Sequence, residues 1–204
     1  MTMPLWLAAE PLVLASRSEV RRLVLVNAGI PVETQPADID ERGIEAKATT
    51  SNASEVAALL AREKARAIAT RLPGRLVLGA DQTLALGERR FSKPAGRDGA
   101  REQLKALRGK THALYSAIAL VRDDIVLFEH CDVARLTMRG FSDAFLEAYL
   151  DAAGVAVTAS VGGYQLEKLG IQLFERIDGS HFTILGLPVL ALLDHLRATG
   201  QLAA

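Results

Sequence analysis

A short apolar run that begins at Leu76 constrains the fold most, because it carries a carboxylate, Asp81, directly after the small residues Gly79 and Ala80. The run is too short for a typical helix and is bounded by turn residues, so it predicts a buried strand with Asp81 at its carboxyl end. Ligands of α/β sheets gather at that end of the strands. A buried carboxylate without a partner costs several kcal/mol, so Asp81 requires a cation, a metal or a reactive water, either for structure or for chemistry.

A lysine follows this strand after a short polar turn. Lys93 comes twelve residues after Asp81, on a Lys-Pro step. The stretch from Leu76 to Pro94 therefore supplies an acid and a base that could share one site.

The charge balance limits the classes of partner. The chain has 204 residues with 24 basic and 24 acidic side chains, so it lacks the overall positive field that binds a nucleic-acid backbone or an acidic membrane. We therefore expect a small-molecule ligand, no nucleic acid and no membrane partner. The length suits a single domain over residues 1–204, with or without two lobes, and leaves the oligomeric state open, a homodimer being one alternative.

The termini and the cysteine content favour a cytoplasmic protein. The first ten residues lack the basic start of a signal peptide, and no apolar stretch is long enough to cross a bilayer. The single cysteine, Cys131, cannot form an internal disulfide and is expected to be a small core residue.

The N-terminal segment predicts a seat for an anion. Leu12–Ala15 is a short apolar strand, and the helix that follows begins after Ser18 and ends near Gly29. Ser16, Ser18 and Arg21 surround the start of this helix, where hydroxyls, a guanidinium and free backbone N–H groups can all bind phosphate. An ordinary capped surface helix is an equal alternative for this pattern alone.

Two further segments offer charged side chains. After a predicted strand at residues 32–36, Asp38, Asp40 and Glu41 form an acidic loop, which suits Mg²⁺ or Mn²⁺ but is also common on solvated surfaces. The longest predicted helix runs from Ser54 to about Arg71 and carries Lys64 near its middle.

The rest of the chain predicts a mixture of crossovers and hairpins, and therefore a mixed sheet. The glycine-rich segment 161–170 is expected to be a loop, and Asp178-Gly179 to be the turn of a hairpin. The predicted helices lie at 98–107, 143–153 and from Pro188 to about Gly200, and the predicted strands at 112–122, 125–138, 171–177 and 182–185.

Several common catalytic motifs are excluded. Gly109-Lys110-Thr111 imitates the end of a P-loop, but it follows a helix and precedes a strand, which is the reverse of the required context. The chain contains neither the nucleophile elbow of an α/β hydrolase nor Cys and His residues at zinc-binding spacing. The four histidines are scattered and are expected to be structural: His112, His130, His181 and His195.

Taken in order, these segments resemble the Maf family of nucleoside triphosphate pyrophosphatases over nearly the whole chain. The matching pieces are Leu-Ala-Ser-x-Ser with Arg21-Arg22, Asp-Ile-Asp-Glu, Arg-Glu-Lys-Ala, Gly-Ala-Asp-Gln-Thr, Lys-Pro, Leu-Arg-Gly-Lys-Thr-His and Gly-Leu-Pro. The resemblance implies an α/β fold similar to inosine triphosphatase, with a bent mixed β-sheet flanked by helices and a cleft between two lobes. It also implies hydrolysis between the α- and β-phosphates of a nucleotide, with a divalent metal, Mg²⁺ or Mn²⁺, as cofactor.

The resemblance assigns roles to individual residues. Asp81 matches the family's catalytic aspartate, which would activate water or hold the metal, and Asp40 falls on an acidic position of its metal-side loop. Positions that would hold the phosphates match Ser16, Ser18, Arg21, Lys64 and Lys93.

Two positions bear on the substrate. Gln82 and Glu167 stand where members acting on thymidine or uridine nucleotides carry Thr and Gln, and both resemble the branch that acts on 7-methyl-GTP. A carboxylate at Glu167 could accept from the N1–H and amine of guanine and would favour the positive charge of the methylated ring. The alternatives are dTTP, UTP or another non-standard nucleotide, and a catalytically weak nucleotide-binding regulator of cell division.

The chain departs from the family pattern at the start of its first helix. Glu19 replaces the usual proline, and Val20 replaces a residue that is often aromatic or Arg. An acid at this place suits the helix dipole but competes with a phosphate for the same donors.

Overall fold

The structure is a computed structural model that describes residues 4–48 and 50–204. The chain divides into two compact units. The first contains the residues up to Gln82, Ser116–Asp132 and Gly186–Ala204, and the second contains Thr83–Tyr115 and Val133–Leu185.

The strands and helices in the described residues agree with most of the predicted ones. The strands are β1 (Leu12–Leu14), β2 (Val32–Thr34), β3 (Leu76–Leu86), β4 (Arg89–Phe91), β5 (Thr111–Arg122), β6 (Ile125–Met138) and β7 (Phe174–Asp178). The α-helices are α1 (Glu19–Asn27), α2 (Glu41–Lys47), α3 (Ala53–Ala69), α4 (Gly96–Leu107), α5 (Asp143–Ala153), α6 (His181–Ile184) and α7 (Val189–Ala198), and short 3-10 turns lie at η1 (Gly154–Thr158), η2 (Val161–Gly163) and η3 (Leu169–Leu173).

The described strands form one mixed sheet, which confirms the predicted fold class. Its order is β2-β1-β3-β5-β6-β7, with β4 paired to β3. The pairs β1–β2 and β1–β3 are parallel, whereas β3–β4 and β6–β7 are antiparallel. Parallel strands early in the chain and hairpins later are the arrangement that the sequence indicates.

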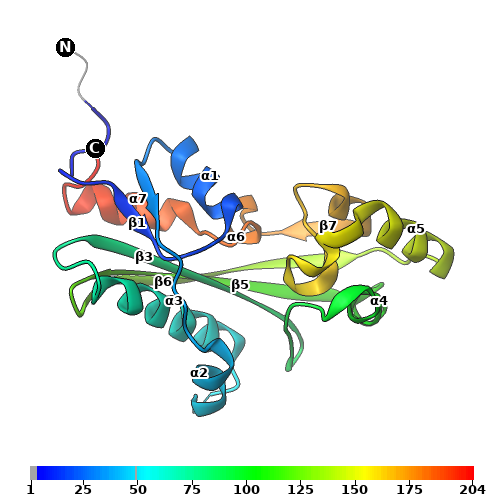
Figure 1. The fold of residues 1–204 in the computed structure, drawn as a ribbon. Helices are drawn as coiled ribbons and strands as arrows, with labels where there is room; N and C mark the ends of the chain where they lie inside the picture. Colours follow the sequence, from blue (N-terminus) through cyan, green and yellow to red (C-terminus); the bar gives the residue numbers. More distant parts are fainter. Residues whose placement is uncertain (1–3, 49) are drawn as a thin grey trace. The chain divides into compact units, whose positions relative to one another are not determined.

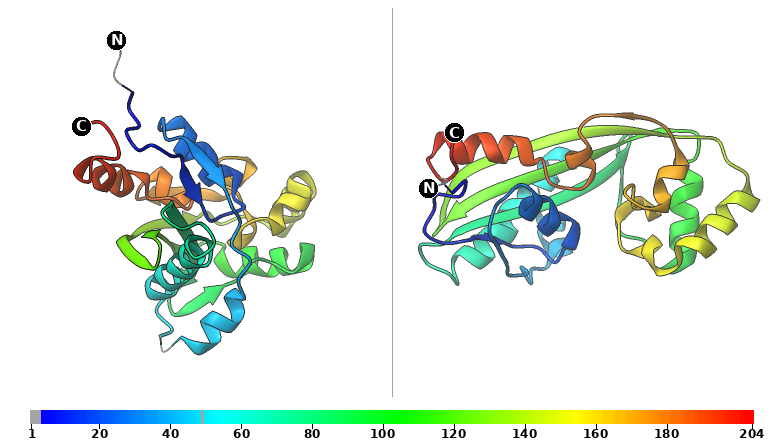
Figure 2. Two further views of the ribbon diagram at one scale, coloured as in Figure 1. Left: turned by 60° about the vertical axis from the view of Figure 1, so that its left-hand side comes forward. Right: turned by 90° about the horizontal axis from the view of Figure 1, so that it is seen from above.

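In the first unit, helices cover both faces of the sheet. Figures 1 and 2 show α1 and α7 on one side of β3 and α3 on the other. Gly79 allows α3 to approach β3 closely, because a Cβ at this position would lie 1.9 Å from the backbone oxygen of Ala61. Ala61 and Ala65 are fully buried at this contact. Small residues on both elements therefore bring the α3 backbone against the strand that carries Asp81.

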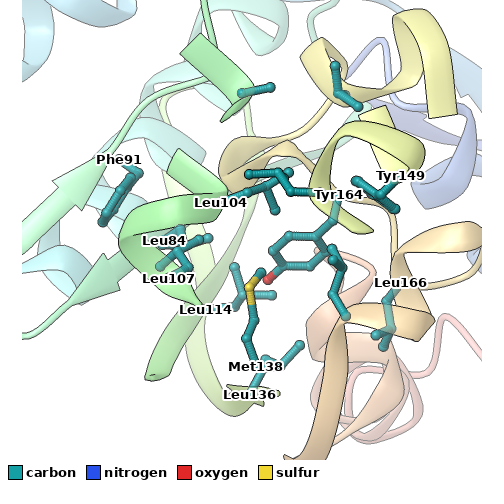
Figure 3. Packing of buried hydrophobic residues seen from close by; sticks show 14 of the residues in the cluster. Leu84, Phe91, Leu104, Leu107, Leu114, Leu136, Met138, Tyr149, Tyr164 and Leu166 are labelled. Atoms are coloured by element: carbon teal, nitrogen blue, oxygen red, sulfur yellow. The ribbon is translucent and has the colours of Figure 1, made fainter. Parts of the chain in front are cut away.

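The second unit has its own apolar core, with Tyr164 near its centre (Figure 3). The Tyr164 hydroxyl lies 2.7 Å from Nε2 of His112, which is 2% exposed. At the surface, Glu147 of α5 pairs with Arg97 and Arg101 of α4, at 3.0 and 2.5 Å. Burial lowers the pKa of His112 to about 4, so the imidazole is neutral at pH 7.

Two sequence predictions near the C-terminus are wrong. The predicted strand at 182–185 is the short helix α6, and the predicted strand at 171–177 begins as a 3-10 turn and becomes extended only at Phe174. Short apolar runs do not distinguish a strand from a buried helical turn. Here the chain leaves Gly179, which packs against Ala134 of β6, and enters α6, whose Thr183 and Ile184 are buried.

Two elements were not predicted. The acidic segment expected to be a loop starts α2, with Asp40 as its N-cap. The turn after β3 leads into β4, which pairs back onto Leu84–Leu86 across Gly87, a residue with φ of 59°. An Asp followed by Glu and a helix-compatible stretch indicates α2, and the two-residue turn Gly87-Glu88 directly after an apolar strand indicates the hairpin with β4.

No helix in the described residues is both long enough and apolar enough to span a membrane.

Replacing Gly79 with alanine should destabilise the first unit by about 3 kcal/mol or more, because the new methyl group meets backbone atoms that cannot rotate away. Urea unfolding monitored by circular dichroism measures this loss. Gly99→Ala of α4 is the control, since a Cβ there makes ordinary contacts with Pro94 at 3.6 Å and alanine favours the helix. Equal stability of the two variants would contradict the close approach of α3 and β3.

Acid should destabilise the second unit through His112. Its pKa is about 4 in the folded protein and about 6.5 when unfolded, so the unfolded chain binds more protons between these values. The free energy of unfolding should therefore fall by about 3 kcal/mol as the pH drops from 6.5 to 4. His112→Gln, which cannot titrate but can still bond to Tyr164, should remove that part of the pH dependence in urea unfolding. An unchanged slope in this variant would show that His112 contributes nothing to it.

Candidate functional site

The centre of the candidate site is an ion-paired lysine between two carboxylates in the first unit. Lys64 Nζ of α3 lies 2.6 Å from Oδ1 of Asp81 on β3 and 2.8 Å from Oε1 of Glu41 on α2. The side chains of Lys64 and Asp81 are only 12% and 10% exposed, whereas that of Glu41 is 50% exposed. Lys64 is thus the cation that the buried Asp81 carboxylate was expected to require, and Glu41 reaches the same ammonium from the solvent side.

The backbone places these three side chains for identifiable reasons. Side chains alternate along a strand, so Gly79 and Asp81 face the same side, and the approach of α3 at Gly79 sets Lys64 beside the carboxylate. Asp40 starts α2 by accepting a hydrogen bond from the Gly43 N–H at 3.0 Å. Glu41 then occupies the first turn of α2.

Glu41 was named in the acidic segment by sequence reasoning but was not selected as a site residue. The prediction chose Asp40 of the same acidic segment, but the Asp40 carboxylate is engaged in capping its own helix and is exposed. The assignment of Asp40 to a metal stays a prediction that the structure does not test. Had the segment been recognised as a capped helix start, Asp40 would have been expected to cap and Glu41 to be available.

The residues present fit a Mg²⁺ or Mn²⁺ ion bound together with substrate. Among the described residues no group of three or more His, Cys, Asp or Glu side chains forms a ready-made metal cage. Mg²⁺, however, is usually held by one or two carboxylates and the phosphates of a substrate. Glu41 and Asp81 with one ammonium between them leave a net negative charge, which suits such a cation.

Arg21 of α1 also contacts β3, and its guanidinium is fixed by hydrogen bonds within the protein. Its Nε donates to the Gly186 carbonyl at 2.9 Å, and its Nη1 donates to the Ala80 carbonyl at 2.7 Å and to Ser16 Oγ at 3.4 Å. Burial lowers the pKa of this guanidinium, and the negative charges of Asp81 and Glu41 oppose that shift. Arg21 therefore fixes the backbone one residue before Asp81.

Gly186 makes this arrangement possible. The residue has φ of 84°, and a Cβ there would lie 3.0 Å from Nε and Nη2 of Arg21. The Gly-Leu-Pro segment of the sequence thus supplies a carbonyl to Arg21, a structural role that the sequence did not reveal.

The serines of the predicted phosphate seat organise the loop before α1. Ser18 Oγ accepts from the Arg21 N–H at 3.3 Å, as the predicted N-cap, and Ser16 Oγ accepts from the Ser18 N–H at 3.2 Å. The Glu19 carboxylate pairs with Arg22, which lowers the pKa of Glu19. Glu19 is thus engaged by a neighbouring cation. Phosphate binding by Ser16, Ser18 and Arg21 stays a prediction.

Gln82 faces the opposite side of the strand from Asp81, as alternation requires. Its Nε2 lies 2.9 Å from Oγ of Ser116, a fully buried residue on β5. This hydroxyl, which sequence reasoning did not single out, holds the amide of Gln82.

The remaining predicted site residues belong to the second unit. Lys93 is exposed directly after β4, and Glu167 is exposed between η2 and η3. Their predicted roles toward phosphate and base stay predictions. The structure therefore brings together Ser16 with Arg21, and Lys64 with Asp81, and it adds Glu41.

Comparison with known proteins identifies the family. Residues 11–199 match the family model described as Maf-like protein. A nucleoside triphosphate pyrophosphatase of Rhodopseudomonas palustris (strain BisB18) is 57% identical over 98% of this chain and 100% of that protein. A 7-methyl-GTP pyrophosphatase of Mesorhizobium japonicum is 50% identical over 95% of this chain and 98% of that protein.

Similarity to solved structures is much weaker. A HAM1 protein from Coxiella burnetii aligns with 16% identity and a TM-score of 0.39, over 63% of this chain and 72% of that one. A TM-score at this level carries no weight for fold or function. The match of the family model over most of the chain, together with relatives above 50% identity, is sufficient: the chain belongs to the Maf family.

Proposed function

We propose that the protein is a nucleoside triphosphate pyrophosphatase, which hydrolyses the bond between the α- and β-phosphates to release a monophosphate and pyrophosphate. The names of the relatives support the reaction, since several at 55–57% identity are nucleoside triphosphate pyrophosphatases. The single observation that carries the proposal is the largely buried Lys64–Asp81 pair, with Glu41 bound to the same ammonium.

This group of side chains suits phosphoanhydride hydrolysis. The reaction needs a positioned water and positive charge near the phosphate oxygens, and little other chemistry from the protein. Asp81 can orient a water and accept its proton. The Lys64 ammonium has three N–H donors, and the two carboxylates account for two of them, so the third can reach a phosphate oxygen.

A divalent metal would complete the charge balance. Glu41 and Asp81 are the described carboxylates that could hold Mg²⁺ or Mn²⁺, and the ion would neutralise phosphate charge when substrate is bound. The positive charges assigned to the phosphates from the family resemblance are Arg21, Lys64 and Lys93.

The proposed substrate is 7-methyl-GTP. The support is the pair Gln82 and Glu167, together with the name of the relative at 50% identity. Relatives of higher identity carry only the general name, so the reaction is supported more broadly than the base.

Asp81→Asn should lower the turnover number by about 10²- to 10⁴-fold with little change in fold, because the amide keeps the shape but cannot accept the proton of water. The measurement is pyrophosphate release from 7-methyl-GTP, GTP, UTP and dTTP, with Mg²⁺ and Mn²⁺ in turn. The highest specificity constant is expected for 7-methyl-GTP, and Glu167→Gln should reduce that preference.

The outcomes separate the parts of the proposal. A maximum with another nucleotide would retain the reaction and remove the proposed substrate. Full activity of Asp81→Asn would remove the mechanism. Folded wild-type protein that binds nucleotides without releasing pyrophosphate would instead indicate a nucleotide-binding regulator.

Substitution of the neighbouring acids Glu41 and Asp40 should change the activity to different extents. Glu41→Gln should lower the specificity constant by about tenfold or more, because it removes one of the two carboxylates on Lys64. Asp40→Asn should leave it nearly unchanged, since asparagine caps a helix about as well as aspartate. The same pyrophosphate assay compares the two variants. The reverse order of effects would assign the functional acid to Asp40, as the sequence alone indicates.

A further inference from the structure

The helices that build the core of the second unit pack on one face of its sheet. α4, α5 and η1 share this core, and the strand residues Leu84, Leu114 and Leu136 face it (Figure 3). Side chains alternate along a strand, so the residues next to these leucines point to the opposite face. A sheet with antiparallel strands commonly leaves such a face to solvent, which makes it accessible to a ligand.

This opposite face contains a cavity of about 200 Å³. Ala85 and Ala113 give the cavity an apolar surface, and the half-buried Tyr115 side chain borders it. Ala85 is only 5% exposed and lies at the bottom, whereas Thr111 and Arg135 are exposed at the rim. Sites that enclose a drug-sized molecule measure roughly 300–1,000 Å³, so this cavity is large enough for one ring system and leaves the rest of a ligand outside.

Arg135 brings to this cavity a positive charge that its neighbours do not neutralise. In the part of the chain that the structure describes, the Arg135 side chain forms neither an ion pair nor a hydrogen bond. Asp178 is its partner in the β6–β7 register, but the Asp178 carboxylate is bound by Nε of Arg176 at 2.9 Å. Arg101 and Arg108 of the same unit are, in contrast, paired with carboxylates. The Arg135 guanidinium is therefore a donor for an anion from outside the protein.

Hydroxyl groups add further donors beside the guanidinium. The Tyr115 hydroxyl has no hydrogen-bond partner among residues 4–48 and 50–204. The Oγ atoms of Thr111 and Thr137 lie 2.8 Å apart, and the hydroxyl that accepts this bond keeps its own proton for another acceptor. A guanidinium with hydroxyls around it matches the oxygens of a phosphate, and the Tyr115 ring offers an aromatic surface to a second planar ring.

We propose that this cavity is a second nucleotide site, which binds a nucleoside monophosphate. The base lies on Ala85 and Ala113 beside the Tyr115 ring, and the phosphate binds Arg135 at the rim. A planar ring joined to a dianion is the combination that this lining selects. The proposed pyrophosphatase reaction releases such a molecule, so the choice of ligand rests on the proposed function, whereas the geometry of the cavity does not. The cavity shares no residue with the candidate site of the first unit.

NMR spectroscopy of the full-length, ¹⁵N-labelled protein tests the proposal residue by residue. Titration with GMP should shift the amide signals of Ala113 and Tyr115, whether or not GMP also binds elsewhere. Arg135→Gln should raise the dissociation constant obtained from these two signals by about tenfold or more, because a charge-assisted contact with the phosphate is lost. Guanosine, which has no phosphate, should bind wild type about tenfold more weakly than GMP does.

Arg89→Gln is the matched control. Arg89 is an exposed arginine of β4 in the same unit, and its register partner Leu86 packs against the core, so Arg89 lies on the other face of the sheet. This variant removes the same charge and should leave the dissociation constant unchanged. Ala113→Leu keeps every charge but fills the cavity, so it should abolish the shift at Tyr115 while a dispersed spectrum shows that the protein is folded.

The outcomes separate this site from the proposed reaction. Absence of shifts at Ala113 and Tyr115, or an Arg135→Gln variant that binds GMP as tightly as Arg89→Gln does, would overturn the second site. Asp81→Asn should bind GMP at these residues as wild type does, since Asp81 does not line the cavity. If wild type releases no pyrophosphate but shows the shifts, the proposed function fails and the second site is retained.

Discussion

The candidate site depends on one ammonium group. Lys64 lies between Asp81, which is nearly buried, and Glu41, which faces solvent. A buried carboxylate without a partner is costly, and removing one member of such a pair commonly costs about 3–5 kcal/mol. The lysine therefore stabilises Asp81 in the middle of β3, just beyond the part of the strand that pairs with β1. In the proposed reaction, the same positive charge that stabilises Asp81 would also bind phosphate.

Two contacts with the β3 backbone hold this group in place. Gly79 admits the α3 backbone, and Arg21 binds the carbonyl of Ala80, between Gly79 and Asp81. Gly186 allows the guanidinium to approach by having no side chain. These three residues, Gly79, Arg21 and Gly186, thus determine where the Asp81 carboxylate lies. Arg21 in particular positions the backbone next to Asp81 through its hydrogen bond to the Ala80 carbonyl, and this role is independent of any phosphate binding.

The sequence predicted the elements whose signals are local. The buried strand that carries Asp81, the cap at Ser18, and α5 over Asp143–Ala153 follow from apolar periodicity and capping residues, and the structure confirms them. The predicted position of Asp81 at the end of its strand is wrong, because β3 continues to Leu86 and pairs there with β4. The sequence could not distinguish a strand from a short helix at Phe182, because a run of four residues, three of them apolar, fits both. It also could not choose Glu41 over Asp40, since that choice depends on which acid caps α2 and which side chain reaches Lys64 from a different helix. Contacts between distant segments, such as Arg21 with Gly186, leave no local pattern in the sequence.

The central claim is that Glu41 and Asp81 act together through Lys64. A double-mutant cycle on the specificity constant for nucleotide hydrolysis tests it most directly, using Glu41→Gln, Lys64→Met and the double variant. If the carboxylate works through the ammonium, the double variant should be little slower than Lys64→Met alone, because the interaction is already lost. Losses that multiply would show that Glu41 and Lys64 act independently, and would contradict the account.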